Sequence, residues 1–323
     1  MLPVPRRIAA NAFPLGAFTD RSVSVTLVVP ALDEAETIAR TVEAAVHLRG
    51  EGVIDEVVVA DSGSRDATAA RAEAAGARVI AAAEVYPASG PLLGKGDTMW
   101  RALSLVETEV VAFMDADLDG DLDGIITGLV GPLVAATPAM PDHHGPADSG
   151  SGIDGLDATP VAFVKGAFHR IAPDGAAPDD PFDGGRVTEM MARPLLNLWR
   201  PDLAGFRQPL SGQVAGRREL LRSIPFLTGY AVEIGMLLDV VDRVGLDAMV
   251  EVDLGTLRNR PRTSAALAPM AQEVLYGFSR RAMPSAGRPR WRPYWRPGEV
   301  DYPESTVVER PPIDPFGPVG SLL

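Results

Sequence analysis

The segment VVAFMDAD at residues 110–117 decides the fold class. A short run of β-branched and apolar residues is typical of a buried strand, and this run ends in two carboxylates, Asp115 and Asp117. Side chains alternate along a strand, so both carboxylates can point the same way at its carboxyl end. Such a pair is costly unless a cation joins it, and Mg²⁺ or Mn²⁺ suits it, with substrate phosphates completing the shell. The alternative is that the pair caps a helix.

The same stretch also resembles the start of an EF-hand calcium loop, because acidic residues recur at positions 115, 117, 119 and 121 around Gly120. An EF-hand would close with a glutamate at position 126, where this chain has Ile126. Its loop would also follow a helix, whereas this stretch follows a strand-like run. The EF-hand is therefore excluded.

Strands and helices alternate along the first 120 residues. Strands are predicted at residues 23–29, 56–60, 78–81 and 110–114, with helical segments between them that include residues 67–75 and 98–106. This alternation implies an α/β fold with a parallel sheet and right-handed crossovers. Ligands of such sheets bind outside the carboxyl ends of the strands. Pro30, Asp61 and Asp115 all fall at such ends, so we expect one polar site there.

The chain of 323 residues suffices for one large or two modest domains. We expect an irregular amino-terminal arm at residues 1–22, an α/β half at 23–165, a smaller and more helical half at 166–283, and a proline-rich tail at 284–323. Helices of the second half are predicted near residues 187–199, 217–223, 232–244 and 267–281. The tail is expected to be extended, and either mobile or wrapped on a partner subunit.

Composition excludes several classes of protein. The formal net charge of −13 disfavours non-specific binding to nucleic acid. The chain has no cysteine, which excludes disulfides and thiolate metal sites. It has no apolar run of about 18 residues and no apolar segment of a secretory signal, so we expect a soluble cytoplasmic protein without a membrane partner.

Several motifs carry a specific resemblance. VVPALDEAETI (28–38) and VVVADSGSRDAT (57–68) resemble the nucleotide-contacting loops of family 2-like glycosyltransferases with the GT-A fold. In chain order, five further motifs resemble the glucosyl-3-phosphoglycerate synthase family: GKGDTMWRAL (94–103), MDADLD (114–119), GGRVTEMMARPLL (184–196), QPLSGQVAGRRELL (208–221) and GYAVEIGMLLDVVDRVGLDA (229–248). The similarity covers roughly residues 23–283.

This resemblance implies a GT-A fold, Rossmann-like with a mostly parallel sheet, and a retaining enzyme that transfers glucose from UDP-glucose to 3-phosphoglycerate. Residues 23–165 would then bind the nucleotide sugar, and residues 166–283 would bind the acceptor. The resemblance also implies Mg²⁺ or Mn²⁺ as cofactor, a nucleotide-sugar donor and a small anionic acceptor as binding partners, and a homodimer.

The resemblance assigns the donor side of the site. Pro30, Leu32 and Glu34 would hold the uridine, and Asp61 and Ser62 would lie beside the same nucleotide. Each also has a plainer interpretation, because Pro30 can simply stop a strand and Ser62 can simply belong to a turn.

Lys95, between Gly94 and Gly96, would lie by the donor diphosphate. Lysine supplies a point charge there, and we interpret the two glycines as letting the backbone approach a ligand. Asp115 would contact the nucleotide and Asp117 the metal ion. Without the resemblance, the sequence GKG would indicate an ordinary turn.

The acceptor side is assigned to the motif that contains Gly185, Arg186 and Thr188. Helix N-terminal N–H groups, a guanidinium and a hydroxyl can together bind an anion, and in the family this motif binds the phosphate of 3-phosphoglycerate. The alternative is a helix cap with a surface arginine. His169 is expected near the acceptor, although a lone histidine is more often structural or exposed.

Two further segments are expected beside the transferred sugar. Leu210 and Ser211 lie in a turn whose main-chain carbonyl could accept a hydrogen bond from the acceptor hydroxyl. Glu233 lies near the start of a predicted helix among apolar neighbours, which suits either a helix terminus or a functional pocket. In the family this glutamate contacts the glucose hydroxyls.

One departure from the family pattern concerns the metal. The family has a histidine, a metal ligand, just before an Arg-Asn-Arg sequence, whereas here Leu257 precedes Arg258 and Asn259. The ion would then be held by Asp117, the diphosphate and water, or by Asn259, and Arg258 could neutralise the diphosphate instead. This departure keeps open a related glycosyltransferase of actinobacterial secondary metabolism, with another sugar nucleotide such as a GDP-sugar and a non-phosphoglycerate or sulfur acceptor. A nucleotide-sugar-binding protein without activity is the alternative from another class.

Overall fold

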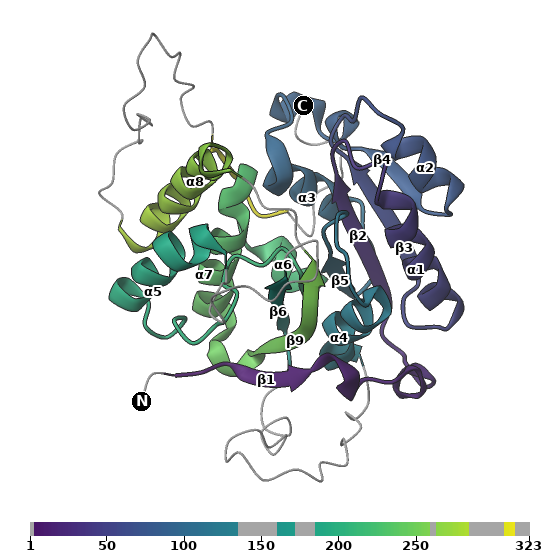
Figure 1. Cartoon of the computed structure of the whole chain (residues 1–323), viewed down its shortest axis with the longest axis horizontal. Helices are drawn as coiled ribbons and strands as arrows, with labels where there is room; N and C mark the ends of the chain where they lie inside the picture. Colours follow the sequence, from purple (N-terminus) through teal and green to yellow (C-terminus); the bar gives the residue numbers. More distant parts are fainter. Residues whose placement is uncertain (1–2, 135–159, 172–184, 259–262, 284–306, 314–323) are drawn as a thin grey trace.

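The computed structural model describes residues 3–134, 160–171, 185–258, 263–283 and 307–313 of the chain. Its centre is an eight-stranded sheet of order β1-β9-β6-β7-β5-β2-β3-β4 (Figure 1). The strands are β1 (Arg6–Ala9), β2 (Val25–Ala31), β3 (Glu56–Asp61), β4 (Arg78–Ala81), β5 (Val110–Phe113), β6 (Phe163–Ile171), β7 (Val214–Arg217) and β9 (Met249–Arg258). All neighbouring strands pair in parallel except β7, which is antiparallel to β5 and β6. The predicted α/β fold with a mostly parallel sheet is confirmed.

Helices cover both faces of this sheet. In Figure 1, α1 (Ile38–Gly50) and α2 (Thr68–Ala74) lie at the right, and α5 (Arg193–Trp199), α7 (Val232–Val244) and α8 (Ser264–Ala282) lie at the left. The remaining α-helices are α3 (Gly94–Ser104), α4 (Leu122–Val134) and α6 (Arg218–Ser223). The expected division near residue 165 falls inside β6, so both halves of the chain contribute to one sheet.

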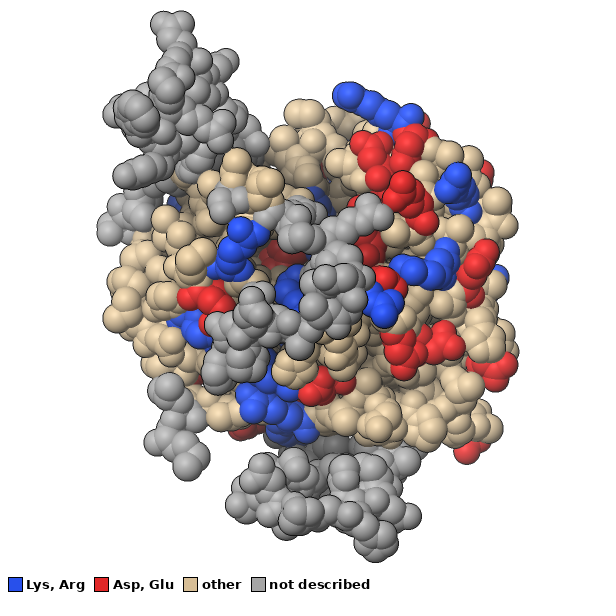
Figure 2. Space-filling model, viewed as in Figure 1, with Lys and Arg blue, Asp and Glu red and all other residues tan. Residues whose placement is uncertain are grey.

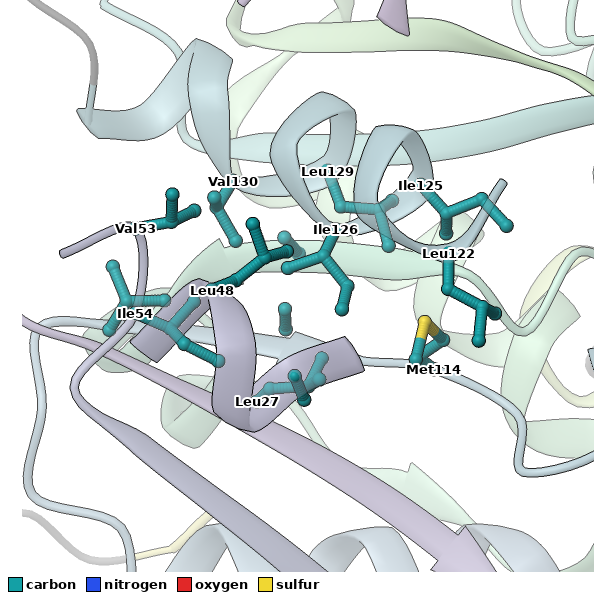
Figure 3. Packing of buried hydrophobic residues seen from close by; sticks show 14 of the residues in the cluster. Leu27, Leu48, Val53, Ile54, Met114, Leu122, Ile125, Ile126, Leu129 and Val130 are labelled. Atoms are coloured by element: carbon teal, nitrogen blue, oxygen red, sulfur yellow. The ribbon is translucent and has the colours of Figure 1, made fainter. Parts of the chain in front are cut away.

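Two apolar cores lie on the opposite faces of the sheet. Successive residues of a strand point to opposite faces, and in β2 Leu27 belongs to one core and Val28 to the other. Figure 3 shows the first core, where Leu48 of α1 and Ile126 of α4 pack close to Leu27. Helices α3, α5, α6, α7 and α8 contribute to the second core. Each core buries a continuous apolar layer, and the carboxyl ends of the central strands remain available for a site.

The amino-terminal segment differs from the irregular arm that the sequence indicated. It begins with β1, which pairs in parallel with β9 at the edge of the sheet. Only Ile8 of this strand is buried, so the apolar alternation of a strand is missing from the sequence. Arg7 also binds the buried carboxylate of Glu251 at 3.1 Å. Pairing with β9 and this ion pair, rather than a hydrophobic pattern, hold the amino-terminal segment at the edge of the sheet.

Residues 307–313 form a strap that returns to the body of the molecule. Within it, β10 (Glu309–Arg310) pairs antiparallel with β8 (Phe226–Leu227). Arg310 makes two hydrogen bonds of 2.8 Å to the carboxylate of Asp97 in α3. The Trp100 indole donates a hydrogen bond to the Pro311 carbonyl. This part of the tail therefore binds its own chain, where the sequence indicated a mobile arm or one wrapped on a partner subunit.

The surface carries both signs of charge. On the face in Figure 2, Lys and Arg side chains are interspersed with acidic ones and form no continuous basic surface among the described residues. None of the helices in the described ranges combines the length and the apolar composition that crossing a bilayer requires.

Candidate active site

A cleft of about 1360 Å³ opens at the carboxyl ends of the central strands. Its walls come from the loops after β2 and β5, the start of α3, the segment before α5, the turn before β7 and one side of α8. Most of the predicted site residues line it: Pro30, Leu32, Glu34, Ser62, Lys95, Asp115, Asp117, Gly185, Arg186, Thr188, Leu210, Ser211 and Glu233. The structure thus brings the expected donor and acceptor motifs to one cavity.

Lys95 lies at the centre of the cleft between two carboxylates. Its Nζ is 2.5 Å from Asp115 Oδ1 and 2.9 Å from Glu233 Oε1. Burial disfavours the charged form of Lys95, but Asp115 and Glu233 outweigh burial and raise its pKa above the ordinary value. Lys95 is therefore a fixed positive charge over the whole working range of pH.

Asp115 is held by a second partner, Gln213. The Gln213 side chain donates from Nε2 to Asp115 Oδ2 at 2.7 Å, and its Oε1 accepts from the Asp115 main-chain N–H at 3.0 Å. Burial alone would raise the pKa of Asp115, but Lys95 and Gln213 lower it below the ordinary value. The Asp115 carboxylate therefore stays ionised and fixes the orientation of Lys95.

The glycines beside Lys95 serve close packing, and Gly94 also lines the cleft, so its predicted role in letting the backbone approach a ligand stays a prediction. A Cβ at Gly96 would lie 2.0 Å from the Leu227 carbonyl oxygen and 2.8 Å from Val232. Gly94 has φ +72 and packs against Gly229. Only glycines let the start of α3 come this close to the segment before α7. This close packing brings Lys95 of α3 next to Glu233 of α7.

Gly212 is the position at which adding one methyl group should disturb only the ion pair of Lys95 and Asp115, called the charged pair below. A Cβ there would lie 2.2 Å from Lys95 Nζ and 2.8 Å from the carboxylate oxygens of Asp115. These atoms are side-chain ends, which can move without moving the backbone. We expect Gly212→Ala to lower kcat by roughly 10²-fold, since a misplacement of about 1 Å is that costly, with little change in melting temperature. A variant that keeps wild-type kcat would contradict this geometry.

The loops after β2 and β3, which the sequence assigned to the donor, are joined by hydrogen bonds. The Asp33 main-chain N–H donates to Ser64 Oγ at 3.0 Å, and the Arg65 N–H donates to Asp33 Oδ1 at 2.7 Å. Asp33 has φ 55, a left-handed conformation that aspartate tolerates. Ser62, which lines the cleft, shares a hydrogen bond of 2.8 Å with Thr98 of α3. The loops therefore form a connected wall.

Asp61 is not among the residues that line the cleft. Its carboxylate accepts hydrogen bonds from Ser64 and from the Gly63 main-chain N–H. It thereby shapes the turn that presents Ser62. The predicted contact of Asp61 with the nucleotide remains a prediction.

Gly185, Arg186 and Thr188, which the sequence assigned to the acceptor, precede α5 and line the cleft. Thr188 begins a π-helical turn, Thr188–Ala192, a rare conformation that is frequent at functional sites. Thr188 is buried and Arg186 is exposed at the cleft. Gly185 has φ +95, a left-handed conformation that favours glycine. The segment can therefore present main-chain N–H groups, a hydroxyl and a guanidinium to an anion.

His169 of β6 lies outside the cleft, although the residues on either side of it line the cleft. Phe168 and Arg170 line the cavity, whereas His169 is exposed and is not among the lining residues. The Arg170 guanidinium lies 4.9 Å from the centre of the Phe168 ring and beside Gly185. The sequence interpretation missed Arg170, because it placed His169 at the site and the period-two pattern of a strand puts neighbouring residues on opposite faces.

The structure shows what occupies the place where the family has its metal-binding histidine. Leu257 is fully buried in the first core, where it packs over Gly120. Arg258 is bonded to the main chain of Asp119, and its side chain lies 3.9 Å from the Asp119 carboxylate, outside the cleft lining. Asn259 lies outside the described residues. Within the described ranges, no three His, Cys, Asp or Glu side chains converge on a point where protein side chains alone could hold an ion.

The cleft also contains an acidic residue that the sequence interpretation missed, Glu273 of α8. Its Oε2 accepts a hydrogen bond of 2.6 Å from the Tyr230 main-chain N–H. Burial raises the pKa of Glu273, and the nearby Glu233 adds to this rise. The helical segment around Glu273 contains no motif that would have marked this residue. Glu273 therefore adds a second carboxyl group on the side of the cleft that carries Glu233.

Comparisons with known proteins agree with this geometry. The family model for glycosyl transferase family 2 matches residues 26–119, which contain the donor-side loops, Lys95 and both aspartates. Glucosyl-3-phosphoglycerate synthase of Mycolicibacterium smegmatis is 38 % identical over 298 residues, covering 91 % of this chain and 90 % of that protein. The synthase of Petrotoga mobilis is 32 % identical over 259 residues, covering 79 % of this chain and 72 % of that protein.

Solved structures extend the similarity to the whole fold. Mannosyl-3-phosphoglycerate synthase from Rubrobacter xylanophilus superposes with a TM-score of 0.79 at 34 % identity, covering 95 % of this chain and 94 % of that one. Glucosyl-3-phosphoglycerate synthase from Mycobacterium tuberculosis, in complex with Mn²⁺, UDP-glucose and phosphoglyceric acid, superposes with a TM-score of 0.77 at 33 % identity, covering 97 % and 99 %.

Proposed function

Because the chain belongs to the glucosyl-3-phosphoglycerate synthase family of glycosyltransferases, we propose that it transfers a hexose from a nucleoside-diphosphate sugar to 3-phosphoglycerate with retention of anomeric configuration. UDP-glucose is the donor we favour, because the M. tuberculosis relative binds it together with phosphoglyceric acid. The predicted GT-A fold is confirmed by the superposition on that family.

The observation that supports this proposal is the position of Lys95. Its ammonium, fixed by Asp115 and Glu233, lies in the same cleft as the donor loops and the Gly185–Arg186 segment. A fixed positive charge between a nucleotide-binding wall and an anion-binding segment suits a reaction in which a diphosphate leaves.

The chemistry we propose takes place on one face of the sugar. The acceptor hydroxyl attacks the anomeric carbon from the side on which the diphosphate leaves, and the hydroxyl proton passes to a leaving phosphate oxygen. Lys95 stabilises the charge that develops on that diphosphate. Glu233 accepts hydrogen bonds from sugar hydroxyls, and the turn with Leu210 and Ser211 positions the acceptor hydroxyl beside them.

The cleft can bind a divalent cation through one protein carboxylate, with the substrate phosphates and water as the other ligands. Asp117 lines the cleft next to Asp115, and Mg²⁺ is commonly bound by one or two carboxylates together with substrate phosphates and water. The M. tuberculosis synthase binds Mn²⁺ together with UDP-glucose and phosphoglyceric acid, and Mg²⁺ together with UDP. We propose Asp117 as the protein ligand, with the ion supplying positive charge to the diphosphate.

Arg186 gives the test of the acceptor side. We expect Arg186→Ala to raise the KM for 3-phosphoglycerate about 10–100-fold, because a charge-assisted hydrogen bond contributes about 1.5–3 kcal/mol, while kcat changes less. The control is Arg78→Ala, which removes an arginine of β4 that pairs with Glu56 away from the cleft and should leave this KM unchanged. An unchanged KM for Arg186→Ala would refute the phosphate-binding role.

A donor and acceptor panel tests the whole proposal. UDP-glucose, GDP-glucose and the corresponding mannose nucleotides are incubated with the full chain, Mg²⁺ or Mn²⁺ and 3-phosphoglycerate, and the released nucleoside diphosphate is measured. Release that requires 3-phosphoglycerate supports the proposal. Turnover with another acceptor would support the related glycosyltransferase, which the buried Leu257 favours. Nucleotide-sugar binding without turnover would support the non-catalytic alternative.

The homodimer is a separate proposal. Met190, Leu198 and Trp199, around α5, are large apolar side chains that are exposed in the single chain. Large apolar side chains exposed along one segment suit an interaction surface. Light scattering at micromolar concentration should give twice the mass of one chain, and the mass of one chain would contradict the dimer.

A further inference from the structure

Lys165 is a buried cation that the proposed mechanism does not use. It lies in β6 and is 2 % exposed. Its Nζ donates a hydrogen bond of 2.8 Å to the main-chain carbonyl oxygen of Ser211. Burying an ammonium is costly, and an apolar side chain of similar volume would often be as stable or more so. The charge therefore calls for a functional explanation.

The chain uses lysine sparingly. Of its 30 Lys and Arg residues, two are lysines, Lys95 and Lys165. Arginine is planar and stays charged, whereas the lysine ammonium is compact and can lose its proton when buried. Both lysines belong to one cluster, because the charged groups that face Lys165 are Glu233 of α7, Lys95 of α3, Asp115 after β5 and Glu251 of β9.

A turn at residues 210–213 connects Lys165 to the central charged pair. Ser211 receives the Lys165 hydrogen bond. The next residue, Gly212, packs directly against Lys95 and Asp115. The residue after it, Gln213, holds both the main chain and the carboxylate of Asp115. A shift of the Ser211 carbonyl would therefore move the atoms that orient the pair.

We propose that Lys165 is a positioning residue for glycosyl transfer: its ammonium holds the Ser211 carbonyl and so keeps the 210–213 turn against Lys95 and Asp115. This inference rests on the proposed function. The role is indirect, since Lys165 is not among the residues that line the cleft. It acts by alignment, and a misplacement of about 1 Å can cost roughly 10²-fold in rate.

The proton on Lys165 should matter near neutral pH. Burial lowers the pKa of Lys165 to about 7, with the attraction of Glu233 opposing the fall and the repulsion of Lys95 adding to it. The charged form donates the stronger hydrogen bond. We therefore expect kcat to decline as the pH rises above about 7.

Stability should change with pH in the opposite direction. Between about pH 7 and the ordinary lysine value of 10.5, the unfolded chain binds a proton at Lys165 that the folded chain does not. The contribution of Lys165 to the free energy of unfolding therefore rises with pH across this window. If Lys165 were only structural, activity and stability would change with pH in the same direction. If it positions the turn, activity falls above pH 7 while stability rises.

The first experiment observes both lysines directly. Full-length protein labelled with ¹³C and ¹⁵N in lysine should give two sets of side-chain NMR signals. We expect one set to titrate near pH 7 and to disappear in Lys165→Met, and the other, from Lys95, to stay in the charged form up to pH 9. In Lys165→Met the Lys95 signals should shift. Lys95 signals that stay unchanged in this variant would overturn the proposal, whether or not the proposed reaction is correct.

The second experiment compares Lys165→Met with Lys165→Gln, which keeps an N–H donor without a charge. We expect Lys165→Met to lower kcat at least tenfold with both KM values within about threefold, and to lose the decline above pH 7. The kcat of Lys165→Gln should be several-fold higher than that of Lys165→Met, and it should not decline above pH 7. Melting temperatures at pH 7 should be no lower than wild type.

The outcomes separate the two hypotheses. Wild-type protein that releases no nucleotide with any donor of the panel contradicts the proposed function, and the NMR titration still decides on Lys165. Wild-type turnover with a Lys165→Met variant that keeps its kcat within twofold, or that loses activity in proportion to lost folded protein, contradicts the positioning role alone.

Discussion

Replacing Lys95 by methionine should lower kcat by roughly 10²–10³-fold, the usual loss when one group that stabilises developing charge is removed. Lys95 is the charge in the cleft that two carboxylates hold in place, at 2.5 Å from Asp115 and 2.9 Å from Glu233. Methionine keeps much of the volume and removes the charge. The measurement is nucleotide release at saturating donor and acceptor, with the melting temperature recorded alongside.

A second variant separates catalysis from stability. Without Lys95, the carboxylates of Asp115 and Glu233 lose the cation between them, and two neighbouring like charges destabilise the folded chain. Lys95→Met combined with Glu233→Gln removes this repulsion. We expect the double variant to recover the melting temperature that Lys95→Met loses, whereas its kcat stays low because both the Lys95 charge and the Glu233 carboxylate are absent. Recovery of turnover together with stability would show that Lys95 is structural.

Lys95 should not produce a pH dependence of its own near neutrality. Its pKa is raised in the folded chain, so the stabilisation it gives is fully present below the ordinary lysine value of 10.5 and is lost only above it. Any decline of kcat between pH 7 and pH 9 therefore points to another group, for which Lys165 is the candidate.

Replacing Arg310 by methionine should destabilise the folded chain by about 1.5–3 kcal/mol, the usual contribution of hydrogen bonds to a charged group, because Asp97 keeps its other partners. Arg310 belongs to the strap and binds Asp97, which is fully buried in α3. Arg101 would remain beside Asp97, at 3.3 Å. Because Asp97 accepts the Leu93 main-chain N–H at the start of α3, the loss should also loosen the helix that carries Lys95.

The control for this variant lies at the neighbouring position of the strap. Glu309 pairs with Arg281, but its side chain is 38 % exposed and solvent screens the pair, so Glu309→Gln should change stability by less than about 1 kcal/mol. Chemical denaturation at pH 7 measures both variants. Equal stability of Arg310→Met and Glu309→Gln would contradict the role we assign to Arg310.

The sign of the pH effect gives a further check on Asp97. Burial alone would raise the pKa of Asp97, but Arg310, the Leu93 N–H and Arg101 together lower it below the ordinary value of 3.8. The resulting stabilisation is present above that value and is lost as the pH falls below it. The stability difference between wild type and Arg310→Met should therefore shrink under acid conditions.

Much of the fold could be predicted from the sequence, because buried parallel strands and amphipathic helices have clear periodicities. The helix predicted at residues 232–244 matches α7, Val232–Val244. Strand β9 was missed because Glu251 and Asp253 interrupt its apolar run. The structure pairs both with Arg207, and Glu251 also with Arg7, residues distant in sequence whose proximity no local pattern reveals.

The site could be predicted in part for a similar reason. Lys95, Asp115 and Glu233 stand in motifs that resemble a known family, and the structure brings them together. The roles of Gln213 and Lys165 depend instead on the pairing of β6 and β7 and on the turn before β7. Register between distant strands follows from tertiary packing, so these residues became visible only in the folded chain.

The most direct test of the central claim is to follow by ¹H NMR the full-length chain with UDP-glucose, 3-phosphoglycerate and Mg²⁺. We predict that the anomeric signal of UDP-glucose is replaced by that of an α-linked glucoside of phosphoglycerate, with one UDP released for each glucoside formed. A β-linked product would contradict the retaining mechanism. Unchanged UDP-glucose in the presence of 3-phosphoglycerate would contradict the proposed donor and acceptor.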